Sequence, residues 1–427
     1  MIRTCTIVFL RSPKQQFPAH LKTISLSATL LFALVANAEA QEFPEPSNRR
    51  HTIDLVSGSA LGSSRIVGMG GTAIAIAEGS SGMLANPASA GVRPTTSNDT
   101  WDWDWHLDST TADLGSDYDN NGIESRSSGL DPSFTVGLVI HYKDWGIGVT
   151  ALTQSAVERI SEGDITTEVK SETNQGRFAL AHWMLDGQLV LAGGVRTILL
   201  DVERTTVDAQ NSLANSTNSL LSLGGSQIEA GAIWLPKRYN LRAGLSLSPA
   251  AISDTATESC DPLNCFGYIL PEKVKAPWTV GAGIAYRRSN TQWNQHVTTR
   301  WRDERYLVLT ADIVVTGKTK RGVGLEAFSQ HQLQPSGRKH SVSLRGGTEY
   351  EWLPGKLRVR GGSYWEAGRF EDVAGDDVPG RLHVTLGADV RVWTFGFWGN
   401  PYRIKISFAA DLAKRFANSG LSLGLWH

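Results

Sequence analysis

The stretch that decides the fold is Arg381–Val392, which reads RLHVTLGADVRV. Its apolar side chains occupy every second position, and polar or small residues occupy the positions between them. Successive side chains of a β-strand point to opposite faces, so this alternation predicts a strand between an apolar and a polar environment. The same pattern returns at Arg403–Leu412, which reads RIKISFAADL. Further segments with this period predict an all-β fold.

The N-terminus carries the marks of an export signal. Leu26–Ala36 is a mostly apolar segment, preceded by Lys22 and followed by Ala38-Glu39-Ala40. This order predicts a signal peptide at residues 1–40 that is cleaved before Gln41. No other apolar run approaches the roughly 18 residues of a transmembrane helix. Export combined with many alternating strands predicts a transmembrane antiparallel β-barrel in the bacterial outer membrane, with outer-membrane lipids around it.

Charge and cysteine content narrow the class of protein. The formal net charge is −1, and it becomes −4 without residues 1–40, so nothing indicates nucleic-acid binding. Cys5 leaves with the signal peptide, whereas Cys260 and Cys265 remain in the sequence CDPLNC. In an oxidising compartment we expect these two cysteines to form a disulfide. A two-cysteine metal site is the alternative, but no histidine or further cysteine stands nearby, and we expect no cofactor.

Fifteen candidate strands follow residue 100. The first begins at Trp101 and places Trp103 and Trp105 on one face, as in the aromatic girdle of a barrel. The remaining candidates are Phe134–Tyr142, Trp145–Leu152, Phe178–Met184, Leu189–Leu200, Ile228–Leu235, Leu241–Leu247, Trp278–Tyr286, Tyr306–Val315, Gly322–Phe328, Val342–Trp352, Leu357–Trp365, the two opening examples and Leu421–Trp426. Short turns alternate with polar stretches at 108–132, 155–175 and 204–224, which we expect to be long loops. Short periplasmic turns and long extracellular loops are typical of outer-membrane barrels.

The strand count sets a condition on the barrel. A single-chain bacterial barrel with both ends in the periplasm needs an even number of strands, so fifteen candidates mean that one is missed or one is surplus. Phe266–Leu270 is the best candidate for a missed strand. We therefore expect 14 or 16 strands, spanning residues 100–427. An exported β-sandwich also alternates and is the structural alternative, although strands near ten residues and the loop asymmetry favour the barrel.

The polar faces of the strands are rich in charge, and in a barrel they point into the lumen. The residues concerned are Arg242, Arg287, Asp312, Arg345, Glu349, Arg358, Arg360, Asp389, Arg391, Arg403, Lys405 and Asp411. One interpretation is a network of interior ion pairs that holds the barrel together. The other is a path for a solute, lined by the same charges.

Two local motifs resemble functional sites of other proteins. Asp117, Asp119 and Asn121 supply oxygen ligands like those in the first half of a calcium loop, but Ser128 stands where such loops have a bidentate glutamate. A solvated acidic loop is the alternative, and no metal is expected. Gly420–Gly424 matches the esterase pattern G-x-S-x-G, yet it lies on a predicted strand at the end of the chain and lacks the required strand-to-helix turn. We therefore expect no enzyme.

Residues 64–97 read SRIVGMGGTAIAIAEGSSGMLANPASAGVRPTTS. This segment resembles the N-terminal plug of the FadL-type outer-membrane channels for long-chain fatty acids and other hydrophobic compounds. The shared marks are Gly68-Met69-Gly70-Gly71, Glu78 within a small-residue stretch, Asn86-Pro87-Ala88 and Arg93-Pro94.

The resemblance implies a 14-stranded barrel whose lumen is closed by a hatch at residues 41–99. Gly68, Gly70 and Gly71 would let the hatch pack closely against the wall, and Asn86-Pro87 would turn the chain toward it. It also implies uptake of hydrophobic small molecules such as long-chain fatty acids. A barrel of this superfamily that scaffolds or carries surface or periplasmic proteins, without transport, is the alternative function.

Overall fold

A computed structural model gives the structure of residues 43–426, apart from 57, 96, 98–99, 113–116, 124–130, 163–164, 209–215, 255–259, 298–300 and 398–399. The predicted signal peptide at residues 1–40 lies outside the described residues. Within the described residues, no helix is long and apolar enough to cross a membrane.

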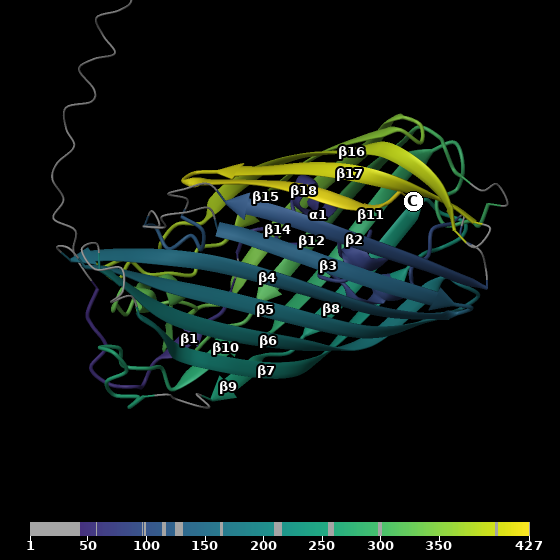
Figure 1. Ribbon diagram of the computed structural model, residues 1–427. Coiled ribbons are helices and arrows are strands. Elements are labelled where there is room, and N and C mark those ends of the chain that lie inside the picture. The colour runs from purple at the N-terminus through teal and green to yellow at the C-terminus, as the bar shows by residue number, and fades with distance from the viewer. Residues whose placement is uncertain are drawn as a thin grey trace, which may run out of the picture. The chain divides into compact units, whose positions relative to one another are not determined.

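The main body is a closed antiparallel barrel of 14 strands (Figure 1). The ring closes because β18 pairs with β2 on one side and β8 pairs with β11 on the other. The barrel strands are β2 (Trp101–Ala112), β3 (Asp131–Tyr142), β4 (Trp145–Glu162), β5 (Ile165–Met184), β6 (Leu189–Asp208), β7 (Ser216–Trp234), β8 (Leu241–Ser248), β11 (Thr279–Ser289), β12 (Tyr306–Thr316), β14 (Ser341–Leu353), β15 (Leu357–Glu366), β16 (Arg381–Phe397), β17 (Asn400–Ala413) and β18 (Phe416–Leu425).

The two faces of the wall are the two environments that the alternation predicts. On β16, Leu386 is 62% exposed on the outside, whereas Asp389 is fully buried inside. Phe408 and Leu412 on β17 are likewise exposed, while Asp411 is buried. An apolar exterior over a closed barrel is the solution by which strands cross a lipid bilayer, because every backbone group is paired within the ring. The expected strand count of 14 is confirmed, and the β-sandwich alternative is excluded.

One of the fifteen candidate strands, Gly322–Phe328, is surplus and accounts for the odd count, and the suggested missed strand at Phe266–Leu270 is wrong as well. Within Gly322–Phe328, only Gly322–Val323 (β13) is extended, and it pairs outside the barrel; the chain then forms the short helix α2 (Leu325–Ser329), which buries Phe328. Phe266–Leu270 contains no strand, because Phe266 and Gly267 turn the chain with φ values of +51° and +92°. Both segments have apolar residues two apart, which a buried turn or helix can also produce.

The predicted long loops at 155–175 and 204–224 are wrong for most of their length. β4, β5, β6 and β7 continue through them as paired strands of 18 to 20 residues. Figure 1 shows β4 and β5 reaching beyond β14 and β15 at the left-hand end. The outward side chains there, such as Arg159, Lys170 and Glu203, are polar. Because these extensions face water, they lack the apolar face from which the barrel strands were predicted.

A small sheet lies at the end of the barrel opposite to the short turns, which is the extracellular end. It has the order β13-β1-β10-β9, with β1 at Thr52–Asp54, β10 at Lys273–Ala276 and β9 at Ala251–Asp254. One face packs into an apolar core that includes Ile53, Val274 and Leu200 of β6. The sheet is therefore anchored to the extended part of the barrel wall.

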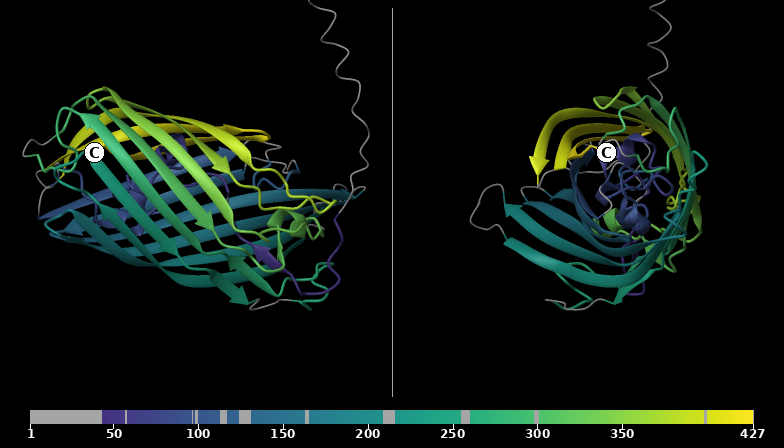
Figure 2. Two further views of the ribbon diagram at one scale, coloured as in Figure 1. Left: turned by 180° about the vertical axis from the view of Figure 1, so that it is seen from behind. Right: turned by 90° about the vertical axis from the view of Figure 1, so that its right-hand side faces the viewer.

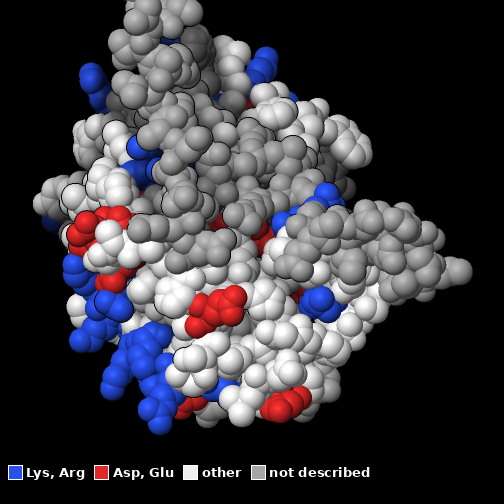
Figure 3. All heavy atoms as spheres, turned by 90° about the vertical axis from the view of Figure 1, so that its left-hand side faces the viewer, with Lys and Arg blue, Asp and Glu red and all other residues white. Residues whose placement is uncertain are grey.

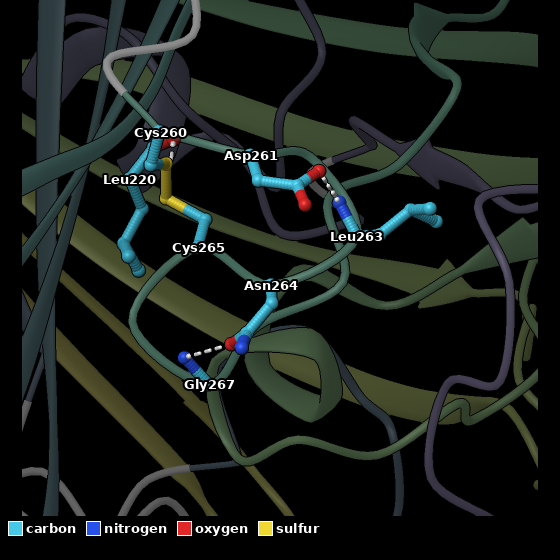
Figure 4. The surroundings of a disulfide bond; sticks show 7 residues. All are labelled: Leu220, Cys260, Asp261, Leu263, Asn264, Cys265 and Gly267. Carbon is cyan, nitrogen blue, oxygen red and sulfur yellow. Dashed lines mark hydrogen bonds between the residues drawn. A yellow bond between two sulfur atoms is a disulfide. The ribbon is translucent and has the colours of Figure 1, made fainter.

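The expected disulfide between Cys260 and Cys265 is present in the same extracellular region (Figure 4). Cys265 is fully buried in the apolar core, and its Sγ lies 3.8 Å from the carbonyl oxygen of Leu220. Asp261 and Asn264 accept backbone N–H groups within the segment, at 3.0 and 3.2 Å. The bond thus closes a compact turn against the extension of β7.

The N-terminal segment that precedes β2 lies inside the ring of strands, as the purple and blue trace in the right-hand view of Figure 2 shows. It contains the short helix α1 (Ser64–Gly68) and the single turns η1 (Ser80–Gly82) and η2 (Pro87–Gly91). α1 contacts β15, β16, β17 and β18, whereas η2 contacts β4 to β7. The segment therefore touches both sides of the wall.

Candidate functional site: the lumen of the barrel

The N-terminal segment meets the wall through glycine backbones on both sides of the contact. A Cβ atom added to Gly68 would lie 2.9 Å from the Cα atom of Gly387 on β16. Gly70 has a φ of +66°, and a Cβ atom there would lie 2.7 Å from the backbone nitrogen of Ser363. Its own N–H donates to the hydroxyl of Thr385 at 2.8 Å. Side chains at these positions would push the segment off the wall.

Asn86 and Pro87 place the segment on the other side of the lumen. The amide nitrogen of Asn86 donates to the carbonyl oxygens of Ile74, Ala232 and Leu245, at 3.0, 3.2 and 3.2 Å. Its Oδ1 accepts the N–H of Ala88 and so caps η2, which Pro87 begins. One buried side chain thus holds a turn of the segment together and binds it to β7 and β8.

Acidic residues of the wall accept backbone N–H groups of the segment. Asp108 accepts from Ser64 at 2.8 Å, and Asp104 accepts from Ser80 at 2.6 Å. Asp312 accepts from two consecutive residues, Ala73 and Ile74, at 2.8 and 3.0 Å. The buried N-terminal segment has little helix, so many of its backbone N–H groups have no partner within the segment. The wall carboxylates accept hydrogen bonds from these groups, and such charge-assisted bonds are strong. Asp104 lies on the polar face of the first predicted strand, whereas Asp108 falls at the start of the predicted loop 108–132 and belongs instead to β2. The sequence does not show what either residue binds.

The strongest feature of the lumen is a chain of buried ion pairs that starts in the wall. Arg360 binds Asp389 with two guanidinium nitrogens, and its Nε donates to Glu349 at 2.7 Å. Lys405 approaches Asp389 at 3.5 Å. Glu349 also accepts from Arg65 of the N-terminal segment, at 3.2 Å. The wall charges of β14 to β17 are therefore paired with one another and with the segment.

The same chain of ion pairs continues to the opposite wall. Arg65 donates to Glu78, also in the segment, at 3.4 Å, and Arg242 of β8 donates to the other oxygen of Glu78 at 2.6 Å. Arg242 in turn stacks on Trp293, 4.0 Å from the ring centre. Five charged groups, namely Glu349, Arg360, Arg65, Glu78 and Arg242, thus link β14 and β15 to β8 through the segment. Arg65 has no motif that would mark it in the sequence, and its pairing was missed.

The other predicted lumen residues lie around this chain. Arg345 donates to the carbonyl oxygen of Gly71 at 3.0 Å, which fixes the third glycine of the motif. Asp411 accepts from the hydroxyl of Tyr364 at 2.6 Å and binds the ring of His383 at 2.8 Å. Neither of these aromatic partners was singled out from the sequence, because pairing across three strands depends on register.

Three further predicted residues lie toward the periplasmic end. Arg358 binds Glu351, and Arg403 binds Asp303 at 2.6 and 2.8 Å. Arg391 is half-buried next to a bulge in β16, beyond the chain of ion pairs. Arg287, the remaining predicted lumen residue, is buried and donates to Glu304 at 3.0 Å.

Two cavities lie on opposite sides of the N-terminal segment. The periplasmic cavity has a volume of about 70 Å³ and is lined by charged groups and aromatic rings, including Arg242, Arg403 and Trp301. The extracellular cavity has a volume of about 140 Å³. Its apolar lining comes from Leu55, Val56, Ala156, Ile198, Leu325 and Phe370, and its polar lining includes Gln154, Gln175, Glu158, Asp119 and Glu326.

Two carboxyl groups at the extracellular cavity have raised pKa values. Burial and the neighbouring Asp117 carboxylate raise the pKa of Asp119 to about 8. Burial and Asp119 also raise the pKa of Glu326 well above its usual value. Removing a carboxylate from water and placing it beside another disfavours its charged form. At neutral pH this rim of the cavity is therefore largely uncharged at Asp119.

The calcium candidates lie in the same region, but their oxygens bind the loop itself. Asp117 accepts the N–H groups of Asn121 and Gly122, at 2.9 and 3.1 Å, and Asp119 also accepts from Asn121. The side-chain oxygen of Asn121 accepts from Ile123 at 2.7 Å. Across the described part of the chain, no three His, Cys, Asp or Glu residues are arranged to hold a metal ion. The side-chain oxygens of this turn therefore accept the turn's own backbone N–H groups.

With this architecture in view, comparison with known proteins becomes informative. The sequence matches no protein-family model and no curated protein. The structure matches the toluene transporter TodX of Pseudomonas putida, with a TM-score of 0.51, 13% identity and coverage of 88% of this chain and 98% of that chain. It also matches the toluene transporter TbuX of Ralstonia pickettii, with a TM-score of 0.50, 12% identity and coverage of 86% of this chain and 97% of that chain. The match to the CymD monoaromatic hydrocarbon channel has a TM-score of 0.51 and 13% identity, and it covers 87% of this chain and 97% of that chain.

At these identities the likeness establishes the fold. The fold of this chain is that of the three matched proteins, and the 14-stranded barrel that the resemblance implies is present. The three matched proteins are two toluene transporters and a monoaromatic hydrocarbon channel.

Proposed function

We propose that this protein is an outer-membrane channel for the uptake of small hydrophobic compounds. The observation that carries the proposal is the extracellular cavity of about 140 Å³, which lies inside the wall and has apolar side chains on several sides. An engineered apolar cavity of about 150 Å³ binds benzene, so the volume suits a ligand of about one aromatic ring. A long-chain fatty acid is several times larger and would fit only in part. We therefore favour ring-sized compounds over long-chain fatty acids.

The proposal assigns a separate role to each of three segments of the chain. Residues 1–40 direct export, residues 41–99 act as the hatch, and residues 100–427 form the channel wall. Support comes from Gly68, Gly70 and Asn86, whose backbone and side-chain contacts hold the segment between the two cavities. Passage of a ligand from one cavity to the other requires the hatch to shift, which breaks part of the chain of ion pairs.

The test is to fill the cavity without disturbing the wall. Ala156 lines the cavity, whereas its neighbour Val157 lies on the other face of β4. We expect Ala156→Trp to slow uptake of radiolabelled toluene by cells that carry the protein, and Val157→Trp to leave it near the wild-type rate. Uptake that is equal in all three strains contradicts the assigned path. Wild-type uptake no faster than in cells without the protein contradicts the channel function itself.

A further inference from the structure

The small extracellular sheet and the loop beside it carry a cluster of cations, here called the basic patch. It consists of Arg50, Lys273, Lys275, Lys318, Lys320 and Arg321. Backbone and side-chain contacts bring these segments together: Thr52 donates to the carbonyl oxygen of Arg321 at 3.0 Å, and the Nζ of Lys275 donates to the carbonyl oxygen of Lys318 at 2.9 Å. Figure 3 shows Lys and Arg gathered along one side of this end of the molecule.

The alternation of β10 fixes where the patch points. Val274 is 4% exposed and packs with Ile53 in the apolar core, so Lys273 and Lys275 lie on the opposite face, away from the lumen. Ile252 of β9 lies directly opposite Lys275 in the register and is 56% exposed. The patch therefore belongs to the outer surface, and it includes an exposed aliphatic side chain beside the cations.

Few acidic groups balance the patch. Arg321 pairs with Glu272 at 3.3 Å, but both side chains are about half exposed, and such pairs are weak. The register also places Asp54 opposite Lys275, but the Asp54 carboxylate binds Arg369 at 2.9 Å. Among the side chains that the structure describes here, the neighbouring acids are Glu272, which is about half exposed, and Asp54, which Arg369 already binds, so the six cations leave an excess of positive charge.

An aromatic residue next to β10 indicates that the patch lies near the lipid headgroups. Trp278 follows β10, and its ring centre is 5.5 Å from that of His340, as in the aromatic girdle at a membrane interface. The carbonyl oxygen of Trp278 accepts the N–H of Gly317, the residue before Lys318. Val280, two residues beyond Trp278, is exposed on the lipid face. The cations thus begin directly above the interface.

We infer that the basic patch binds the phosphate groups of the phosphorylated glycolipid that forms the outer leaflet of the outer membrane. Lysine and arginine side chains just outside the apolar band are placed to bind anionic headgroups, and Ile252 offers a contact for the lipid's apolar part. The site is separate from both cavities, so it does not depend on the proposed transport function.

The test uses the full-length protein in a neutral detergent and measures lipid binding by native mass spectrometry. The probes are bis-phosphorylated lipid A, dephosphorylated lipid A with the same acyl chains, and inorganic phosphate. The variant is K275Q/K318Q. The matched control is R338Q/K339Q, since these exposed cations at the same end are paired with Glu371 and Asp377, at 2.8 and 2.6 Å.

We expect the wild type and the control to prefer phosphorylated lipid A, and the variant to bind it about tenfold more weakly, since each cation near a charged surface adds measurably to affinity. Folding of each variant is checked by its heat-dependent shift in gel mobility. Equal binding of the dephosphorylated lipid overturns the inference, as does a variant that retains wild-type affinity. Binding of inorganic phosphate that matches that of the lipid would show a general anion surface and also overturn it.

Discussion

The contacts inside this barrel join single residues that lie far apart in the sequence. Glu349 accepts from Arg360, from Tyr306 and from Arg65 of the N-terminal segment. Its position in the lumen follows from alternation alone. Its pairing does not, because Arg65 lies 284 residues away and belongs to a segment without regular periodicity. Sequence patterns give the face on which a residue lies, whereas its partner depends on register and on how the segment is folded.

The ion pairs at Glu349 predict a large effect of a small change. Glu349→Gln keeps the shape of the side chain but leaves Arg65 and Arg360 buried with less opposing charge. Removing one partner of a buried ion pair costs about 3–5 kcal/mol, so we expect a loss of that size in urea-induced unfolding from lipid vesicles. Glu272→Gln, which removes an exposed ion pair with Arg321, is the control, and we expect a loss below about 1 kcal/mol. Equal losses in both variants would contradict the importance of the buried pairs.

The raised pKa of Asp119 predicts a pH dependence at the extracellular cavity. The pKa is about 8 in the folded protein and 3.8 for the unperturbed group. Below pH 3.8 the group is protonated in both states and has no effect. As the pH rises from there to about 8, the unfolded chain ionises while the folded protein resists ionisation, so the stability of the loop falls.

The groups that set this dependence are Asp117 and Glu366, which raise the pKa of Asp119, and Arg381, which lowers it. We expect the backbone amides of residues 117–123 to be at least about fivefold better protected from hydrogen exchange at pH 5 than at pH 8, after correction for intrinsic rates. Asp119→Asn removes the ionisable group and reduces this difference. A pH dependence that survives unchanged in the variant assigns it to another group.

At the scale of elements, the barrel strands with one apolar face could be predicted, and those without one could not. β16 and β17 are predicted within a few residues because lipid outside and charge inside give a period of two. The extensions of β4 to β7 face water outside, so their polarity looks like that of a loop. α2 was mistaken for a strand, because a helix of one turn is too short for its 3.6-residue period to be distinguished from alternation.

We expect loss of the extracellular disulfide to affect only the structure around it. It closes a loop of six residues, Cys260–Cys265, whose closure entropy corresponds to about 2 kcal/mol. We expect Cys260→Ala combined with Cys265→Ala to speed proteolysis of this region and to leave the barrel's gel mobility unchanged. Reducing the wild type with dithiothreitol should reproduce the effect, and adding it to the double variant should have none. Proteolysis that is insensitive to both treatments contradicts a stabilising role.

At the scale of the whole molecule, the asymmetry of the connections predicts which end faces the outside. The turn at Asp144 is short and lies at the end that carries both ends of the barrel segment, whereas Lys170 lies on an extended strand at the other end. In intact cells we expect a membrane-impermeant maleimide to label Lys170→Cys. Asp144→Cys should react only after the outer membrane is permeabilised. The reverse pattern would show that the barrel is oriented the other way.

The chain of ion pairs from Arg360 through Arg65 and Glu78 to Arg242 also constrains the order of assembly. A segment bonded to opposite walls, with glycine backbones pressed against strands, has no room to enter a finished ring. We expect the strands to close around it, so that the pairing of β18 with β2 encloses residues that are already in place. A chain that lacks this segment must therefore close its ring by a different route, with many interior charges still unpaired. The same contacts that obstruct the lumen thus serve as a template for building the wall.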